Sequence, residues 1–173
     1  ISPDGPNRPQ TPKGPFPYTT EEVTFTNAKA GATLAGTLTV PKGRAKCVII
    51  MVTGSGPENR DEEIYAHKLF AVIADRLARA GIATLRYDDR ATGQSVGGDM
   101  KNATSIDLAE DAAAGIEWLR AQKRFKKGGL LGHSEGGLIA FMLGAQKKDI
   151  RAAKMLDGRA FPHISKVFKT RNI

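Results

Sequence analysis

The sequence predicts an α/β protein, a three-layer α/β/α sandwich whose sheet is mostly parallel and carries an N-terminal antiparallel hairpin. Residues 47–52 are apolar at consecutive positions, which is typical of a strand buried on both faces of a parallel sheet. Strand-like and helix-like segments then alternate with short links, as βαβ units require. Before them, residues 22–26 and 33–40 alternate polar and apolar side chains, and the turn-forming residues 27–31 between them predict a hairpin.

Each later element has its own signal. A helix is expected over residues 61–80, where apolar side chains recur on one face, three acidic residues suit the N-terminal dipole and Gly81 ends the pattern. Thr104 opens a second helix, because Asp107 three residues later completes a capping-box variant. The other expected elements are strands at 82–87, 129–132 and 150–156 and a helix at 135–146.

The two ends of the chain differ in composition from the predicted folded portion between them. Residues 1–19 hold most of the nine prolines and are expected to form an extended leader, because proline fixes φ and lacks an amide donor. Residues 20–158 form the predicted folded portion, and residues 159–173 are a basic tail without strand–helix rhythm. The leader and the first residue, Ile1, favour an exported protein, periplasmic or secreted.

Composition excludes several classes of protein. The chain has 173 residues and a net charge of +8. Most of the excess lies in residues 147–173, where few aromatic side chains accompany the cations, so we expect no nucleic-acid partner. No apolar run is long enough to cross a bilayer. The single cysteine, Cys47, rules out an internal disulfide and a zinc cluster built on thiolates.

The strongest chemical signal is the sequence GHSEGG at residues 132–137, which we call the elbow. It has the G-x-S-x-G pattern and stands between a buried strand and a helix, the context that the pattern requires. The turn is so tight that Ser134 must adopt a strained backbone conformation, and the flanking glycines avoid collisions. Ser134 is therefore the candidate nucleophile, exposed over the carboxyl edge of the sheet; the alternative is a glycine-rich turn with a buried serine.

A second signal is the small, glycine-rich segment that directly follows the first buried strand. Acyl transfer needs two donors aimed at the oxyanion. One is expected to be the backbone N–H of Glu135, the residue after the candidate nucleophile. The other is expected from this segment, with Ser55 N–H favoured and Gly54 N–H as the alternative. Without the elbow, the segment would be an ordinary turn capped by Asp61.

Charged residues also follow the next strand, at Asp88, Asp89 and Arg90. Side chains at the carboxyl end of a parallel strand are placed to touch a substrate. The simpler interpretation, which we prefer, is that Asp88 or Asp89 pairs with Arg90 and holds its loop beside the oxyanion segment.

Taken together, these segments resemble the α/β-hydrolase superfamily, and within it a serine-esterase branch. The resemblance covers residues 20–157 and is carried by G-S-G-P-x-x-R-D at residues 54–61 and by the elbow. It implies an incomplete α/β-hydrolase fold that hydrolyses carboxylic esters through an acyl-serine, on a small ester or acyl substrate, with no metal or cofactor. We expect the family pattern to end near Gly158.

The acid and base of a Ser–His–Asp triad are the weak part of this interpretation. In the superfamily they follow the nucleophile, and the later candidates are Asp157 and His163, with no strand–helix unit between them. His67 precedes the nucleophile in the expected first helix, and His133 is expected to point away from Ser134. We therefore predict a chain that lacks its acid and base and has very weak esterase activity.

Two other functions stay open. The same scaffold would serve as a non-catalytic binding or interaction module, or the same nucleophile would serve a peptidase or lactone hydrolase. We also predict self-association, because the strand at 150–156 leaves a sheet edge for which the following sequence supplies no partner.

Overall fold

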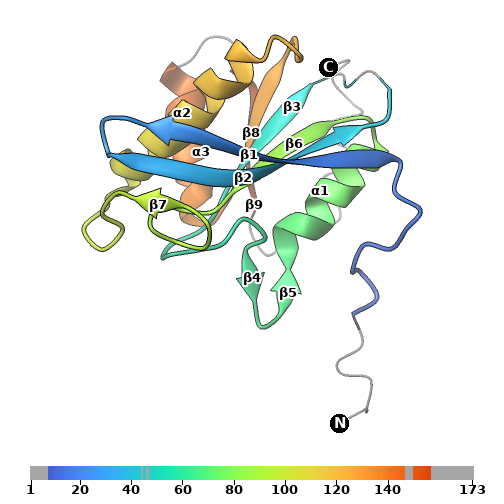
Figure 1. The fold of residues 1–173 in the computed structure, drawn as a ribbon, viewed down its shortest axis with the longest axis horizontal. Helices are drawn as coiled ribbons and strands as arrows, with labels where there is room; N and C mark the ends of the chain where they lie inside the picture. Colours follow the sequence, from blue (N-terminus) through green and yellow to red (C-terminus); the bar gives the residue numbers. More distant parts are fainter. Residues whose placement is uncertain (1–7, 44, 46, 147–149, 157–173) are drawn as a thin grey trace.

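The computed structural model describes residues 8–43, 45, 47–146 and 150–156 and has the predicted architecture. Its main sheet has seven strands, and six of them lie in the order β1-β2-β6-β3-β8-β9 (Figure 1). The neighbours β6–β3, β3–β8 and β8–β9 are parallel, whereas β1–β2 and β2–β6 are antiparallel. The strand bounds are β1 Tyr18–Asn27, β2 Ala32–Pro41, β3 Val48–Val52, β6 Ala83–Tyr87, β7 Val96–Gly97, β8 Gly128–His133 and β9 Ile150–Leu156.

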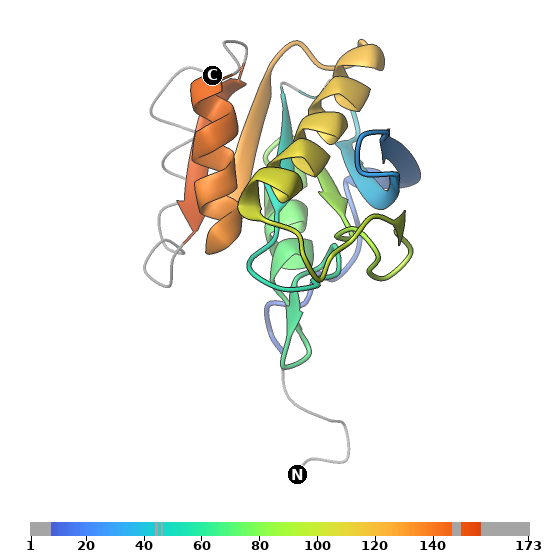
Figure 2. The same ribbon diagram turned by 90° about the vertical axis from the view of Figure 1, so that its left-hand side faces the viewer.

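In the described part of the chain, three helices make the outer layers of the sandwich: α1 (Leu69–Arg79), α2 (Ser105–Ala121) and α3 (Glu135–Gln146). Figure 2 shows α2 and α3 side by side on the near face of the sheet, with α1 behind it. Strand β3 is buried on both faces because helices cover both sides of the sheet. Ile50 packs in the core beneath α2 and α3, and Ile49 packs in the core beneath α1. The three-layer prediction is confirmed.

The predicted cap of α2 is also confirmed. The Thr104 hydroxyl accepts a hydrogen bond from Asp107 N, and the Asp107 carboxylate accepts one from Thr104 N at 2.8 Å. This reciprocal pair satisfies two amides that a helix start would otherwise leave unpaired.

The helix expected over residues 61–80 is wrong in its first part. Residues 63–68 instead form a small hairpin, β4 (Glu63–Ile64) and β5 (His67–Lys68), and α1 begins at Leu69. The two turn residues, Tyr65 and Ala66, have φ of 51° and 57°, and Glu62 before the hairpin has φ of 47°. A helix cannot run through left-handed residues, and neither turn residue is the glycine or asparagine that announces such a hairpin.

The described part of the N-terminal segment, from residue 8 to residue 17, contacts α1 and the β4–β5 turn. Arg79 Nη2 donates to Lys13 O at 3.0 Å, and Arg8 Nη2 donates to Tyr65 O at 2.9 Å. Regular structure begins at Tyr18, two residues earlier than expected. No helix in the described part of the chain is long and apolar enough to cross a bilayer.

At the other end, β9 ends the sheet order and pairs with β8 alone among the described strands. Self-association through this edge stays a prediction, and light scattering over a range of concentrations would test it. The basic tail at 159–173, with His163, and the candidate acid Asp157 lie outside the described residues.

Candidate active site

Ser134 occupies the turn between β8 and α3 and is exposed, with φ of 52°. The two glycines beside it are required by the close approach of the backbone. A Cβ on Gly132 would lie 1.9 Å from Gly136 O, and a Cβ on Gly136 would lie 2.1 Å from Val52 O. The elbow therefore forces the serine into a left-handed conformation at the carboxyl edge of the sheet, which is the geometry that the sequence pattern predicts.

The segment after β3 lies directly beside this serine. A Cβ built on Gly54 would be 3.5 Å from Ser134 Cβ. The Gly54 amide donates to Glu62 Oε1 at 2.8 Å and is therefore occupied. Ser55 is exposed, and within the described ranges its amide has no acceptor. Of the two candidate amides in this segment, Ser55 N–H is the one left free for a ligand.

Glu135 is the first residue of α3, so its amide belongs to the unpaired N–H groups of a helix start. The side chain of Glu135 binds α2, because its Oε1 accepts a hydrogen bond from Ser105 Oγ at 2.5 Å. This contact ties the start of α3 to the start of α2 and leaves the Glu135 amide beside Ser134.

Asp89, two residues after the end of β6, fixes the segment after β3 at Thr53 and Glu58. Its carboxylate accepts hydrogen bonds from Thr53 Oγ1 and Glu58 N, both at 2.9 Å. Burial raises the pKa of Asp89 to about 7, although these hydrogen bonds oppose the rise.

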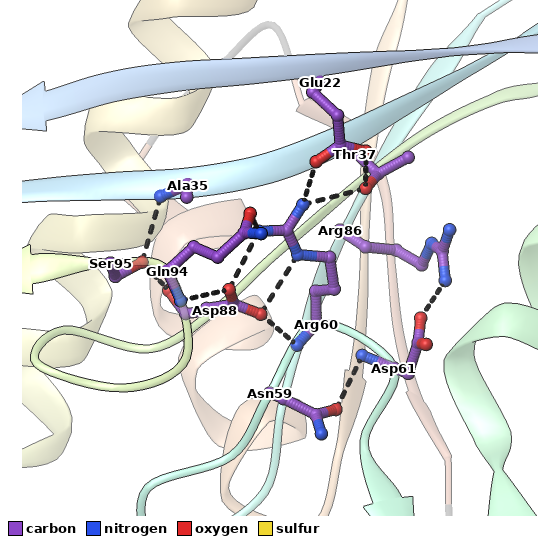
Figure 3. A network of polar contacts seen from close by, with 10 residues as sticks. All are labelled: Glu22, Ala35, Thr37, Asn59, Arg60, Asp61, Arg86, Asp88, Gln94 and Ser95. Atoms are coloured by element: carbon purple, nitrogen blue, oxygen red, sulfur yellow. Dashed lines mark hydrogen bonds and ion pairs between the residues drawn. The ribbon is translucent and has the colours of Figure 1, made fainter.

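Asp88 holds the same segment through Arg60 (Figure 3). Asp88 accepts from Arg60 N, Nε and Nη2 at 2.8, 3.0 and 2.8 Å, and Arg60 Nη1 also donates to Thr37 Oγ1 at 2.9 Å. Burial alone would raise the pKa of Asp88, but the hydrogen bonds from Arg60 and from Gln94 N outweigh it, and the pKa is lowered. The Asp88 hydrogen bond in turn raises the pKa of Arg60.

The expected pairing of these aspartates with Arg90 is wrong. Arg90 turns the other way and forms a bidentate ion pair with the buried Asp111 of α2, at 2.7 and 3.0 Å. Asn27 Nδ2 donates to the same carboxylate at 2.8 Å. Asp88 and Asp89 make structural contacts as preferred, but Arg60, Thr53 and Glu58 take the place of Arg90, and Gln94 N also donates to Asp88.

The described histidines are not bonded to the candidate nucleophile. His67 is exposed on β5, and His133 Nδ1 lies 2.8 Å from Glu62 Oε1, so neither makes a hydrogen bond to the Ser134 hydroxyl. The candidate acid and base, Asp157 and His163, lie outside the described residues. Within the described ranges, no group of three or more His, Cys, Asp or Glu side chains is placed to hold a metal ion.

The sequence does not single out Glu62, because its pattern places this residue in the first turn of a helix. Glu62 is fully buried and contacts both parts of the site, the segment after β3 through Gly54 and the elbow through His133. Its neighbours in the sequence, Asp61 and Glu63, are acidic as well, so no local pattern distinguishes it from them.

The parallel sheet and its elbow define the class of protein, an α/β hydrolase. The family model described as serine aminopeptidase, S33, matches residues 65–165, more than half of the chain, and the chain belongs to this family. The match includes Ser134 and extends beyond Gly158, where we expected the family pattern to end.

Similar proteins include several esterases. The esterase EstD of Thermotoga maritima is 35% identical over 108 residues, which are 61% of this chain and 26% of that protein. The chain thus spans about a quarter of that relative. The esterase Pf2001 of Pyrococcus furiosus has a TM-score of 0.63 and 27% identity over 77% of this chain and 47% of its own. The hydrolase GrgF of Penicillium sp. sh18 shares the fold, with a TM-score of 0.66 and 24% identity over 88% of this chain and 54% of its own.

Proposed function

We propose that this chain carries the nucleophile and oxyanion half of a serine esterase, in the branch with the G-S-G-P-x-x-R-D and G-H-S-E-G-G motifs. Ser134 is the nucleophile, and the amides of Ser55 and Glu135 are the oxyanion donors. The observation that supports the proposal most is the exposed, left-handed Ser134 with Gly54 packed beside it. The names of EstD and Pf2001 point to the same chemistry.

The reaction proceeds in two steps. Ser134 Oγ attacks the ester carbonyl carbon, its proton passes to a base, and the carbonyl oxygen becomes an oxyanion that the two amides bind. The carbon–oxygen bond to the alcohol then breaks, and the alcohol leaves with a proton. Water attacks the acyl-serine, releases the carboxylic acid and returns the proton to Ser134.

The proton acceptor is the limiting group. Asp157 and His163 are the candidate acid and base in this chain, and no described histidine is bonded to the Ser134 hydroxyl. A serine without a base is a weak nucleophile, so we expect slow acylation and p-nitrophenyl acetate turnover near the background rate.

Acylation of Ser134 tests the proposal better than turnover, because an acyl-serine formed without a base also hydrolyses slowly and accumulates. After incubation with p-nitrophenyl acetate, peptide mass spectrometry should find one acetyl group on the peptide that contains Ser134. Ser134→Ala should abolish it. Ser55→Pro, which removes one amide donor, should slow it roughly a hundredfold. Acetyl groups spread over lysines, with none on Ser134, would refute the proposal and favour a non-catalytic binding module.

Peptide hydrolysis is the second candidate, because the family description names an aminopeptidase. An amine leaves a tetrahedral intermediate only when a general acid protonates it, whereas a phenolate or activated alcohol leaves without that help. We therefore expect p-nitrophenyl esters to acylate Ser134 and the matching p-nitroanilides to fail. Equal acylation by both would favour the peptidase.

A further inference from the structure

Glu62 is the most deeply buried carboxylate of the described chain, and it lies between the two halves of the candidate site. It is 0% exposed, and it reaches its position through a left-handed backbone with φ of 47°. A non-glycine residue at such a φ costs energy, and residues of this kind concentrate at functional sites. The surrounding contacts must therefore hold it there.

A single oxygen of Glu62 makes both contacts. Oε1 accepts a hydrogen bond from Gly54 N at 2.8 Å and lies 2.8 Å from His133 Nδ1, which is the donor when the carboxylate is ionised. Oε2 is buried and has no hydrogen-bond partner among the described residues. Burial raises the pKa of Glu62, and the hydrogen bonds from His133 and Gly54 oppose that rise.

The two partners of Glu62 are the chain neighbours of the two groups that the proposed reaction needs. His133 precedes Ser134, and Gly54 precedes Ser55. The space at Gly54 is bounded by Glu62, His133 and Ser134, because a Cβ there would lie 3.3, 3.5 and 3.5 Å from Oε1, Nδ1 and Cβ of these residues. Moving Glu62 would therefore change the separation of the nucleophile and the oxyanion donor.

We propose that Glu62 is a positioning residue, which sets the distance between Ser134 Oγ and Ser55 N–H by holding His133 and Gly54 on one carboxylate oxygen. Glu62 also occupies the Gly54 amide, so that the neighbouring Ser55 amide faces the substrate. His133 is thereby kept as a structural donor and not as the base. This inference rests on the proposed acylation of Ser134.

The test compares Glu62→Ala, Glu62→Gln and the control Glu63→Gln. Alanine removes the acceptor, glutamine keeps an oxygen of the same reach, and Glu63 is an exposed neighbour. The probe is an alkyl fluorophosphonate: Ser134 Oγ bonds to phosphorus, fluoride leaves, and buffer takes the proton. Its phosphoryl oxygen occupies the oxyanion site. Labelling is followed by mass spectrometry at a temperature well below the melting temperature of each variant. The probe concentration is varied, so that the maximal rate constant and the half-saturating concentration are obtained separately.

We expect Glu62→Ala to lower the maximal labelling rate constant roughly tenfold to a hundredfold, less than the outright loss of an oxyanion donor, because the Ser55 amide is displaced and not removed. Its half-saturating concentration should change little. Glu62→Gln should restore most of the rate, and Glu63→Gln should match the wild type. A purely structural role would lower the melting temperature without this change in rate.

The outcomes separate this inference from the proposed function. If Ser134 of the wild type is not labelled, the proposed function fails, and the positioning role fails with it. If Ser134 is labelled at the same rate in the wild type and in Glu62→Ala, the positioning role alone is overturned. If Glu62→Ala does not fold, Glu62→Asp replaces it, because its carboxylate is one methylene too short to hold both His133 and Gly54: a rate at least about tenfold below that of Glu62→Gln supports positioning, and a smaller difference overturns it.

Discussion

The two turns that flank the candidate site are built by different means. The elbow is fixed by contacts within and just beside it, since Gly132 and Gly136 have no room for a Cβ. The segment after β3 is fixed by three buried carboxylates: those of Asp88 and Asp89, which are distant in the sequence, and that of Glu62, which lies 8 positions after Gly54. The first turn depends on backbone sterics and the second on buried charge, so the two should respond differently to mutation and to pH.

The largest effect is expected in the elbow. Gly132→Ala places a Cβ 1.9 Å from a carbonyl oxygen and should cost more than about 3 kcal/mol in the free energy of unfolding, or prevent folding. Gly128→Ala is the matched control on the same strand, because a Cβ there has no neighbour within 4 Å. Urea unfolding would measure both. Equal stability of the two variants would contradict the steric explanation.

The next largest effect is expected where charge holds the second turn. Asp88→Asn removes the buried carboxylate partner of Arg60, which keeps only the more exposed carboxylate of Glu22, and should cost about 3 kcal/mol at neutral pH. Because the folded pKa of Asp88 is lowered, this stabilisation is present above the unfolded pKa and is lost as pH falls through the folded one. The two proteins should therefore converge in acid. Glu21→Gln, which breaks the exposed pair with Arg124, should cost less than about 1 kcal/mol.

Asp89 should give the opposite pH dependence. Its folded pKa of about 7 lies above the ordinary value of 3.8, so the folded state binds a proton that the unfolded state has released. Stability should then fall as pH rises between these values, by up to about 1.4 kcal/mol per pH unit, and level off above them. Thermal melts at several pH values should show this fall in stability with rising pH in the wild type and in the exposed control Asp99→Asn. Asp89→Asn should lack it.

The smallest effect concerns the strain at Ser134. A left-handed non-glycine residue costs about 1–2 kcal/mol, and glycine loses about 0.5–1 kcal/mol of chain entropy on folding. Ser134→Gly should therefore be about 0.5 kcal/mol more stable than Ser134→Ala, which keeps the Cβ and the strain. Urea titrations of the two variants measure this difference, and a less stable glycine variant would show that the turn is relaxed.

The difference between the two turns also decides which features could be predicted from the sequence. The sheet, its N-terminal hairpin, the Thr104 cap and the elbow geometry follow from patterns that span a few residues. The sequence predicts helix over residues 61–68 because three acidic residues suit a helix N-terminus and Ala66 extends the apolar face of α1, whereas the structure has the β4–β5 hairpin there. Glu62 is left-handed, and its partners Gly54 and His133 lie 8 and 71 positions away, so no local pattern indicates its conformation.

The sequence by itself therefore determined the fold class and the position of Ser134, because periodicity and the steric limits of glycine act locally. Only the tertiary structure decided which charges meet. In the folded chain Arg60 pairs with Asp88, Arg90 pairs with Asp111, and the Gly54 amide donates a hydrogen bond to Glu62. The physical reason is that a buried carboxylate needs whichever donors the packed elements bring to it, and the sequence around an aspartate or glutamate does not specify those donors.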